Sequence, residues 1–131
     1  MNSSQVLTAI ANGAVGVSCF VERDPNGQHL LRVNQGTLNG RTIGIGPPYT
    51  TASGVSLMYA VSGFEYLTIG SGGCKAGDRL QSDANGNGIT PPLGGTKIIN
   101  VGGFATEDAI SGDVILVQVE NYTESPGDYL S

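Results

Sequence analysis

Residues 78–88, DRLQSDANGNG, place a short strand pattern directly before a run of turn-forming residues. Asn85-Gly86 and Asn87-Gly88 each favour a positive φ angle, the backbone conformation that tight hairpin turns require. Short runs rich in Val, Ile, Thr and Tyr alternate with similar turn signals along the 131-residue chain. This alternation predicts an all-β fold, a small single-domain β-sandwich or barrel with many tight glycine turns.

Nine strands are expected between the turn signals, because helical periodicity is hard to find anywhere in the chain. They cover residues 5–11, 14–23, 28–34, 41–46, 55–61, 64–70, 78–82, 97–101 and 113–120. Residues 15–120 form one β-rich domain in this interpretation, and residues 121–131 form an irregular polar tail. Residues 1–14 fit two alternatives, an N-terminal arm that orders on a partner or an edge strand with a frayed terminus.

The composition restricts the classes of partner. Glycine accounts for 21 residues without a G-X-Y period, which suits tight turns and excludes collagen. The formal net charge is −5, with six Lys and Arg against eleven Asp and Glu. That sign is wrong for nucleic-acid phosphates and for anionic lipid, so we expect neither nucleic acid nor membrane as a partner. The N-terminal sequence has no basic region followed by a long apolar run, and we therefore expect a protein made in a cytoplasm with reduced thiols.

The segment that begins at Asp83 matches the opening of a calcium-binding loop, D-x-N-x-N-G. Such a loop needs a bidentate glutamate at its twelfth position, which here is Gly94, and its ninth position is Pro91. The next acidic residue is Glu107, so the loop would offer one carboxylate to the cation. We therefore expect a hairpin turn at Asp83, with no metal and no other cofactor.

The side chains that catalysis needs do not occur in a usable arrangement. His29 is the only histidine, so a catalytic triad or a multi-histidine metal site would depend on it alone. Cys19 and Cys74 lack C-x-x-C spacing, and each is expected to be a buried or unpaired thiol. Residues 70–73, GSGG, lack the GK[ST] ending of a phosphate-binding loop. We expect that the protein is not an enzyme.

Residues 17–33, VSCFVERDPNGQHLLRV, predict a hairpin around the turn at residues 24–27. A three-residue loop there gives the expected pairs Arg23–His29, Val21–Leu31 and Cys19–Val33. The expected core face then contains Val17, Cys19, Val21, Leu31 and Val33, and the opposite, mixed face contains Ser18, Phe20, Glu22, Leu30 and Arg32. The last expected strand, residues 113–120 (DVILVQVE), is apolar on both faces, which predicts burial on both sides, inside the domain or at an oligomer seam.

Two stretches resemble tailed-phage capsid decoration, or head cement, proteins. Residues 76–89, AGDRLQSDANGNGI, resemble the family pattern A-G-D-x-[LV]-x-x-D-x-x-G, and residues 101–119, VGGFATEDAISGDVILVQV, resemble its ending, in which an A-x-x-G-[DE] turn precedes an alternating apolar strand. The matching positions are Gly77, Asp78, Asp83, Gly86, Gly103, Ala105, Glu107, Ala109, Gly112 and Asp113. We expect structural turns at Gly27, Gly77, Asp78, Asp83, Gly86, Gly103, Gly112 and Asp113.

The resemblance implies a homotrimer on the outside of a phage head, at threefold or quasi-threefold sites where capsomers meet. Such a protein has no catalytic residues and cements major capsid subunits against the pressure of packaged DNA. Its partners would be the major capsid protein and its own copies, and its location would be the virion capsid surface after assembly in the host cytoplasm. The first candidate for capsid contact is the N-terminal arm, with Gln5, Val6, Leu7 and Ile10.

Two other functions remain open. A phage tail or baseplate β-domain has the same glycine-rich β composition. A small carbohydrate-binding β-sandwich normally exposes aromatic rings that stack on sugars. The chain has no Trp, but Tyr49, Tyr59 and Tyr66 could line a groove, unless they pack in a core or an interface.

Overall fold

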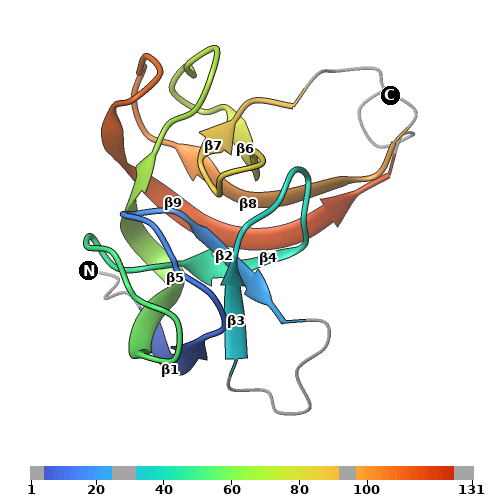
Figure 1. Ribbon diagram of the computed structural model, residues 1–131. Coiled ribbons are helices and arrows are strands. Elements are labelled where there is room, and N and C mark those ends of the chain that lie inside the picture. The colour runs from blue at the N-terminus through green and yellow to red at the C-terminus, as the bar shows by residue number, and fades with distance from the viewer. Residues whose placement is uncertain (1–4, 25–31, 92–96, 126–131) are drawn as a thin grey trace.

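The computed structural model describes residues 5–24, 32–91 and 97–125 (Figure 1). These residues form strands β1 (Gln5–Ala11), β2 (Phe20–Arg23), β3 (Arg32–Gln35), β4 (Thr42–Ile45), β5 (Ser56–Thr68), β6 (Arg79–Ser82), β7 (Gly88–Ile89), β8 (Ile99–Ala105) and β9 (Val114–Glu124). The all-β prediction is therefore confirmed. None of the described segments is a helix long and apolar enough to cross a membrane.

Five strands close into a barrel in the order β1-β3-β2-β4-β5, and an additional β1–β5 pairing completes the circle. β1 runs antiparallel to β5, with Ala9 opposite Leu57, and parallel to β3, with Ala11 opposite Val33. The buried side chains of one core cluster fill this barrel: Ala9, Ala11, Val15, Cys19, Val21, Val33, Leu57 and Tyr59. β1 pairs with β5 over Gln5–Ile10 but with β3 only at Ile10 and Ala11, so the closure on the β3 side is short.

The N-terminal stretch is thus part of the barrel. Residues 5–11 form strand β1, which matches one of the two alternatives for residues 1–14. Residues 1–4 lie outside the described part. Residues 5–11 therefore fit the edge-strand alternative, because β1 pairs with β5 over Gln5–Ile10 and with β3 at Ile10 and Ala11.

The second sheet continues from β5 in the order β5-β9-β8-β6-β7. In Figure 1, β8 and β9 lie side by side and curve across the barrel strands. A second core cluster joins side chains from both parts: Phe20, Ile45, Ala60, Leu67, Ile69, Cys74, Leu80, Ala105, Ile115, Val117 and Val119. Barrel and sheet therefore share one continuous strand, β5, and one buried layer.

The β2–β3 hairpin has a register different from the expected one. Arg23 pairs with Val33 and Val21 with Gln35, so the connection is longer than a three-residue loop. The expected partners His29 and Leu31, and the turn residue Gly27, lie outside the described residues. Phe20, expected on the mixed face, is fully buried, because the second sheet covers the side of β2 that faces away from the barrel interior.

The break expected between strands 55–61 and 64–70, at Ser62-Gly63, is a bend inside one long strand. β5 runs without interruption through 13 residues, and Gly63 takes a φ of 82° within it. Before this glycine, Tyr59 points into the barrel core, and after it Leu67 points into the core between barrel and sheet. A glycine in a positive-φ conformation bends a strand and changes which side of the strand the following side chains face.

Within the chain, β9 is buried on one side only, so burial of both sides inside the domain is wrong, and burial of the outer side at an oligomer seam stays a prediction. Ile115, Val117 and Val119 point into the core, whereas Val114 and Gln118 are exposed. No layer of the described chain covers the outer side of β9. Its apolar residues on that side belong to a surface of the molecule.

Candidate interaction surfaces

The outer side of the second sheet is a partly exposed, mostly uncharged face across three strands, with the exposed Glu120 of β9 and the Arg79 that pairs with Phe104 at its border. We call eight outward-pointing residues on this side the sheet face. They are Phe64, Tyr66 and Thr68 on β5, Val114, Leu116 and Gln118 on β9, Phe104 on β8, and Thr106 directly after β8. The strand register sets Phe64 beside Gln118 and Gln118 beside Phe104, while Tyr66 lies beside Leu116. Tyr66 is 51% exposed and Val114 47%.

A polar cluster borders the sheet face at the β6 side. The ring of Tyr122 stacks on Phe104 with centroids 6.0 Å apart, and its hydroxyl donates to Glu124 at 3.0 Å. Glu124 also pairs with Arg79, and both of these side chains are about one-seventh exposed. Burial, followed by the hydrogen bond to Glu124, raises the pKa of Tyr122 to about 12. This border is charge-balanced and keeps the tyrosine protonated.

The outer side of the barrel presents a second apolar patch. Val6 and Ile10 on β1 point away from the barrel interior, as does Met58 on β5, and they are 47%, 38% and 54% exposed. We call these three residues the barrel patch. Ile10 lies beside Arg32 in the β1–β3 register, which places one exposed cation at its border.

Gln5 and Leu7, the other two residues of the expected capsid contact, differ in position from Val6 and Ile10. Leu7 lies opposite the buried Tyr59 on the side of β1 that faces the interior, yet 47% of it is exposed. Gln5 is exposed and adjoins a register shift between Gln5 and Val6. Val6 and Ile10 are therefore the members of the expected contact that share one outward surface.

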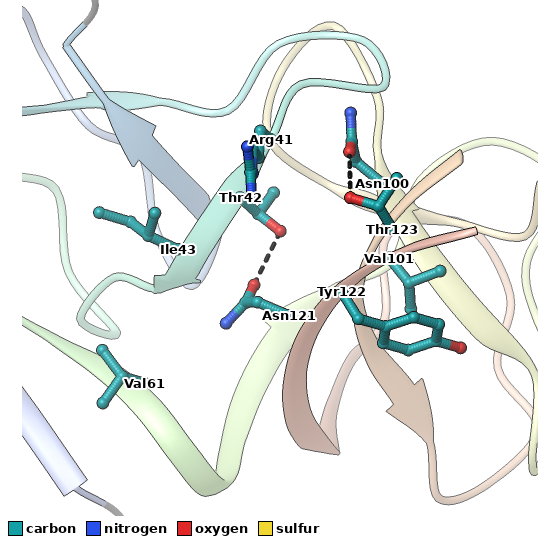
Figure 2. Close-up of a pocket in the computed structure, with 9 residues that line it drawn as sticks. All are labelled: Arg41, Thr42, Ile43, Val61, Asn100, Val101, Asn121, Tyr122 and Thr123. Atoms are coloured by element: carbon teal, nitrogen blue, oxygen red, sulfur yellow. Dashed lines mark hydrogen bonds between the residues drawn. The ribbon is translucent and has the colours of Figure 1, made fainter. Parts of the chain in front are cut away.

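A groove of about 570 Å³ lies between the barrel and the far ends of β8 and β9 (Figure 2). Asn121 accepts a hydrogen bond from Thr42 at 2.9 Å across it, and Thr123 donates to Asn100 at 3.1 Å. Arg41, also at the groove, is exposed. Amide, hydroxyl and guanidinium groups of this kind hydrogen-bond polar, uncharged or anionic ligands.

A second hollow of about 600 Å³ lies among the glycine turns that precede β6 and β9. The carboxylates that line this hollow accept hydrogen bonds from residues of the turns and their surroundings. Asp78 accepts hydrogen bonds from the Lys75 amide and the Thr90 hydroxyl, and Asp113 accepts one from the Ile110 amide. Within the described ranges, no group of three or more His, Cys, Asp or Glu residues is arranged to hold a metal ion.

The expected turn residues occupy three kinds of position. Gly77 and Gly112 have φ angles of 87° and 95°, in two similar turns that end in Asp78 and Asp113. Asp83 accepts two backbone hydrogen bonds through Oδ1, from the amides of Asn85 at 2.8 Å and Asn87 at 2.9 Å. Gly86 has a φ of 79° in that loop, which connects β6 to β7. Gly103 differs from these, since it lies inside β8, where a Cβ would stand 2.7 Å from the carbonyl oxygen of Gln118.

The nucleophiles and aromatic candidates are dispersed. Cys19 and Cys74 are both buried and free, and burial raises the pKa of Cys19 to about 11, so its thiol stays protonated at neutral pH. Tyr59 is buried in the barrel, whereas Tyr66 lies on the sheet face and Tyr49 is exposed in the segment after β4. The three tyrosines therefore do not line one groove.

Sequence reasoning does not single out Phe64, Phe104 or Tyr122. The available signal is the alternation of Phe64, Tyr66 and Thr68, which places three uncharged side chains on one side of a strand. Without knowledge that β5 pairs with β9, this alternation cannot indicate which side is covered.

Comparison with known proteins finds similarity in fold. The structure resembles that described as the N base of head fiber gp8.5 of bacteriophage phi29, with a TM-score of 0.68 and 17% sequence identity, over 90% of this chain and 95% of that chain. No protein-family model matches the sequence, and no curated protein matches it. At this identity the likeness concerns the fold, and it extends over nearly the whole of both chains.

Proposed function

We propose that this protein is a structural component of a phage head that binds the outer surface of the shell and cements major capsid subunits at threefold or quasi-threefold sites. The observation that supports it best is the similarity in fold to a phage head fiber base over nearly the full length of both chains. The decoration-family patterns in residues 76–89 and 101–119 favour the same class. Catalysis forms no part of the proposal.

The barrel patch is the proposed contact with the capsid. Val6, Ile10 and Met58 offer apolar area on strands that the closed barrel holds rigid, so little conformational entropy is lost on binding. Each such patch is small. Three copies bound around one threefold axis would act together, because the second and third contacts form at high effective concentration.

The test is cosedimentation with empty shells assembled from the major capsid protein encoded in the same genome. We expect saturable binding of the wild-type protein, with copies at threefold positions in electron micrographs. Ile10→Lys places a charge in the barrel patch and should strongly reduce binding, while Leu38→Lys, at an exposed apolar residue outside both the barrel patch and the sheet face, serves as the charge-matched control. Absence of wild-type binding to such shells would overturn the proposal.

Deleting residues 1–12 is unsuitable as a test because it removes barrel strand β1. Point substitutions at exposed positions keep the barrel closed. Melting temperatures of Ile10→Lys and the wild-type protein should agree within the few degrees that a surface substitution produces.

The groove of Figure 2 favours a second candidate function, glycan binding. Arg41, Asn100 and Asn121 present polar groups at a hollow of about 570 Å³, and Tyr122, whose ring stacks on Phe104, also lines it. A glycan array with the wild-type protein and Arg41→Ala tests this candidate. Binding that the substitution abolishes would support it, and an array without signal would exclude it.

A further inference from the structure

We propose that Asn85 is a site of spontaneous covalent modification, at which its side chain closes to a succinimide with Gly86 and then opens to aspartate or isoaspartate. The backbone nitrogen of Gly86 attacks the side-chain carbonyl carbon of Asn85, and ammonia leaves. Water then opens the ring at either of its carbonyls. The reaction needs only water as a second reactant, so the inference does not rest on the proposed head function.

Three features of an Asn-Gly pair control this reaction. The residue after the asparagine must leave its backbone nitrogen open to attack, which glycine does because it has no side chain. The asparagine side chain must be free to turn toward that nitrogen. The N–H of the glycine must not be held in a strong hydrogen bond. The chain contains five Asn-Gly pairs, of which Asn26-Gly27 lies outside the described residues.

Hydrogen bonds protect the pair Asn39-Gly40. The side-chain amide of Asn39 donates to the Ile98 carbonyl at 2.8 Å and accepts the Asn100 backbone amide at 2.9 Å, so both of its ends are held. The amide of Gly40 donates to the carbonyl of Thr37 at 2.8 Å. Both the attacking nitrogen and the attacked carbonyl are therefore fixed.

Packing protects the pair Asn87-Gly88. The backbone of Asn87 is held twice by Asp83, because its amide donates to Oδ1 at 2.9 Å and its carbonyl accepts the Asp83 amide at 2.8 Å. Gly88 is buried, and a Cβ on it would stand 2.5 Å from Cδ2 of Leu67. Ring closure has to rotate the backbone at this pair, and the contact with Leu67 leaves no room for that rotation.

The pair Asn12-Gly13 is only partly protected. Nδ2 of Asn12 donates to Oδ1 of Asn34 at 3.3 Å, and the amide of Gly13 donates to the hydroxyl of Ser53 at 3.1 Å. Both bonds are exposed, so water can replace either partner at little cost. We expect a slow reaction at Asn12.

Asn85-Gly86 is the least protected of the four described pairs. Asn85 is exposed, and its side chain makes no hydrogen bond within the described part of the chain. The amide of Gly86 donates to the carbonyl of Asp83 at 3.2 Å, which is longer than the bonds of Gly13 and Gly40. The Asp83 carboxylate binds the backbone amide of Asn85 at 2.8 Å and leaves the side chain free to turn.

The modification would act on the contact between barrel and sheet. Gly86 is buried against the barrel, where a Cβ on it would stand 3.1 Å from Cβ of Cys19, and its carbonyl accepts the Phe20 amide at 2.7 Å. Isoaspartate leads the main chain through its own Cβ and so lengthens the backbone between positions 85 and 86. Because Asp83 holds the loop on one side and Phe20 on the other, we expect the bond between Phe20 and Gly86 to be lost.

The first experiment follows each Asn-Gly pair by peptide mapping and mass spectrometry in wild-type protein kept at mildly alkaline pH. We expect deamidation several-fold faster at Asn85 than at Asn12, and slowest at Asn39 and Asn87. The same incubation in urea should give the four pairs similar rates, because unfolding removes the contacts that distinguish them. Asn85→Gln should remove the early product, since its longer side chain closes a less favourable ring.

The second experiment separates the lengthened backbone from the added charge. Protein with isoaspartate at position 85, separated by ion exchange and identified with a protein isoaspartate methyltransferase, is compared with Asn85→Asp, which has the same charge on an ordinary backbone. We expect the isoaspartate form to melt at a lower temperature. Its Phe20 amide should exchange with solvent several-fold faster, as measured by nuclear magnetic resonance, whereas Asn85→Asp should keep the wild-type exchange rate.

Three outcomes overturn the inference. Deamidation of Asn12 or Asn39 ahead of Asn85 in the folded protein would contradict the assigned site, and the same order of rates in urea would show that the fold does not select it. Equal exchange of the Phe20 amide in the isoaspartate form and in Asn85→Asp would reject the effect on the contact between barrel and sheet. None of these results depends on whether the protein binds phage shells.

Discussion

At the scale of single residues, the neighbouring Gly72 and Gly73 are required for different reasons. Gly72 and Gly73 both have positive φ angles, of 90° and 66°. A Cβ on Gly72 would meet nothing within 4 Å, whereas a Cβ on Gly73 would stand only 2.4 Å from the carbonyl oxygen of Ala109. That carbonyl accepts the Cys74 amide in the bridge that joins the two glycine turns.

The first prediction separates backbone strain from steric exclusion at these two positions. Gly72→Ala should cost about 1 kcal/mol, because alanine in a left-handed conformation is strained by roughly that amount. Gly73→Ala should cost about 3 kcal/mol, since it adds the loss of the hydrogen bonds between Cys74 and Ala109. Urea unfolding of both variants measures the difference, and equal losses would contradict it.

The second prediction concerns alkaline pH. The pKa of Tyr122 is raised from 10.0 to about 12 in the folded protein. Between these two values the unfolded chain loses the phenol proton while the folded chain retains it, so the stability that this proton contributes is present below pH 10 and lost as the pH approaches 12. Cys19, raised from 9.0 to about 11, acts in the same direction over a lower window.

Tyr122→Phe removes one of these titrating groups. The free energy of unfolding of the wild-type protein should fall as pH rises from 10 to 12, and the variant should fall less steeply. Urea titrations at a series of pH values measure both slopes. Identical slopes would show that the Tyr122 hydroxyl is not held protonated by its surroundings.

At the scale of elements, β5 joins the two parts of the molecule. Its first half, with Leu57 and Tyr59, fills the barrel, and its second half, with Leu67, covers the second core. Sequence patterns predict two strands with a turn at Ser62-Gly63, because a serine and a glycine between apolar runs are a common turn signal. The pairing of β5 with β1 up to Ser62 and with β9 from Gly63 onward keeps the backbone extended through this point.

The third prediction tests the bend in β5. Gly63→Ala should lower the free energy of unfolding by about 1–2 kcal/mol, because the φ of 82° is unfavourable for any residue with a Cβ. Ser62→Ala, the adjacent control, should change it by no more than about 0.5 kcal/mol. Chemical denaturation of the two variants compares them, and a Gly63→Ala protein as stable as wild type would mean that the bend needs no glycine.

At the scale of the whole molecule, Phe20 connects the barrel to the sheet. It belongs to barrel strand β2, is fully buried, and packs in the core cluster that includes Leu67 and Val117 of the second sheet. Its amide donates to the carbonyl of Gly86 in the β6–β7 loop, and its own carbonyl accepts the amide of Gly36. We therefore expect barrel and sheet to unfold as one cooperative unit.

The fourth prediction follows from this position. Phe20→Ala should cost about 3–5 kcal/mol, the usual loss for a buried aromatic ring, and should destabilise both parts together. Met58→Ala, at an exposed site, serves as the control. Far-ultraviolet circular dichroism and tyrosine fluorescence should give coincident unfolding curves for the wild-type protein, whereas separate transitions would show that barrel and sheet unfold independently.

The sequence could indicate single residues of the candidate surfaces, but not which residues lie together on one surface. Val6 and Ile10 are among the expected contact residues, and they do share an outward side of β1. Met58 joins them only because β5 pairs with β1 across some fifty residues of sequence. The sheet face likewise combines residues of β5, β8 and β9, whose neighbourhood no local pattern reveals.

By itself, the sequence determined the all-β class and the approximate place of most strands, because side-chain alternation and glycine turns act over a few residues. It determined the Asp83 loop for the same reason, since that carboxylate bonds to amides two and four residues further on. Only the tertiary structure decided that β1 closes a barrel, that Phe20 is buried and that the outer side of β9 is exposed. These features depend on which distant strands pair and which layer covers each side, and residues far apart in the chain settle both.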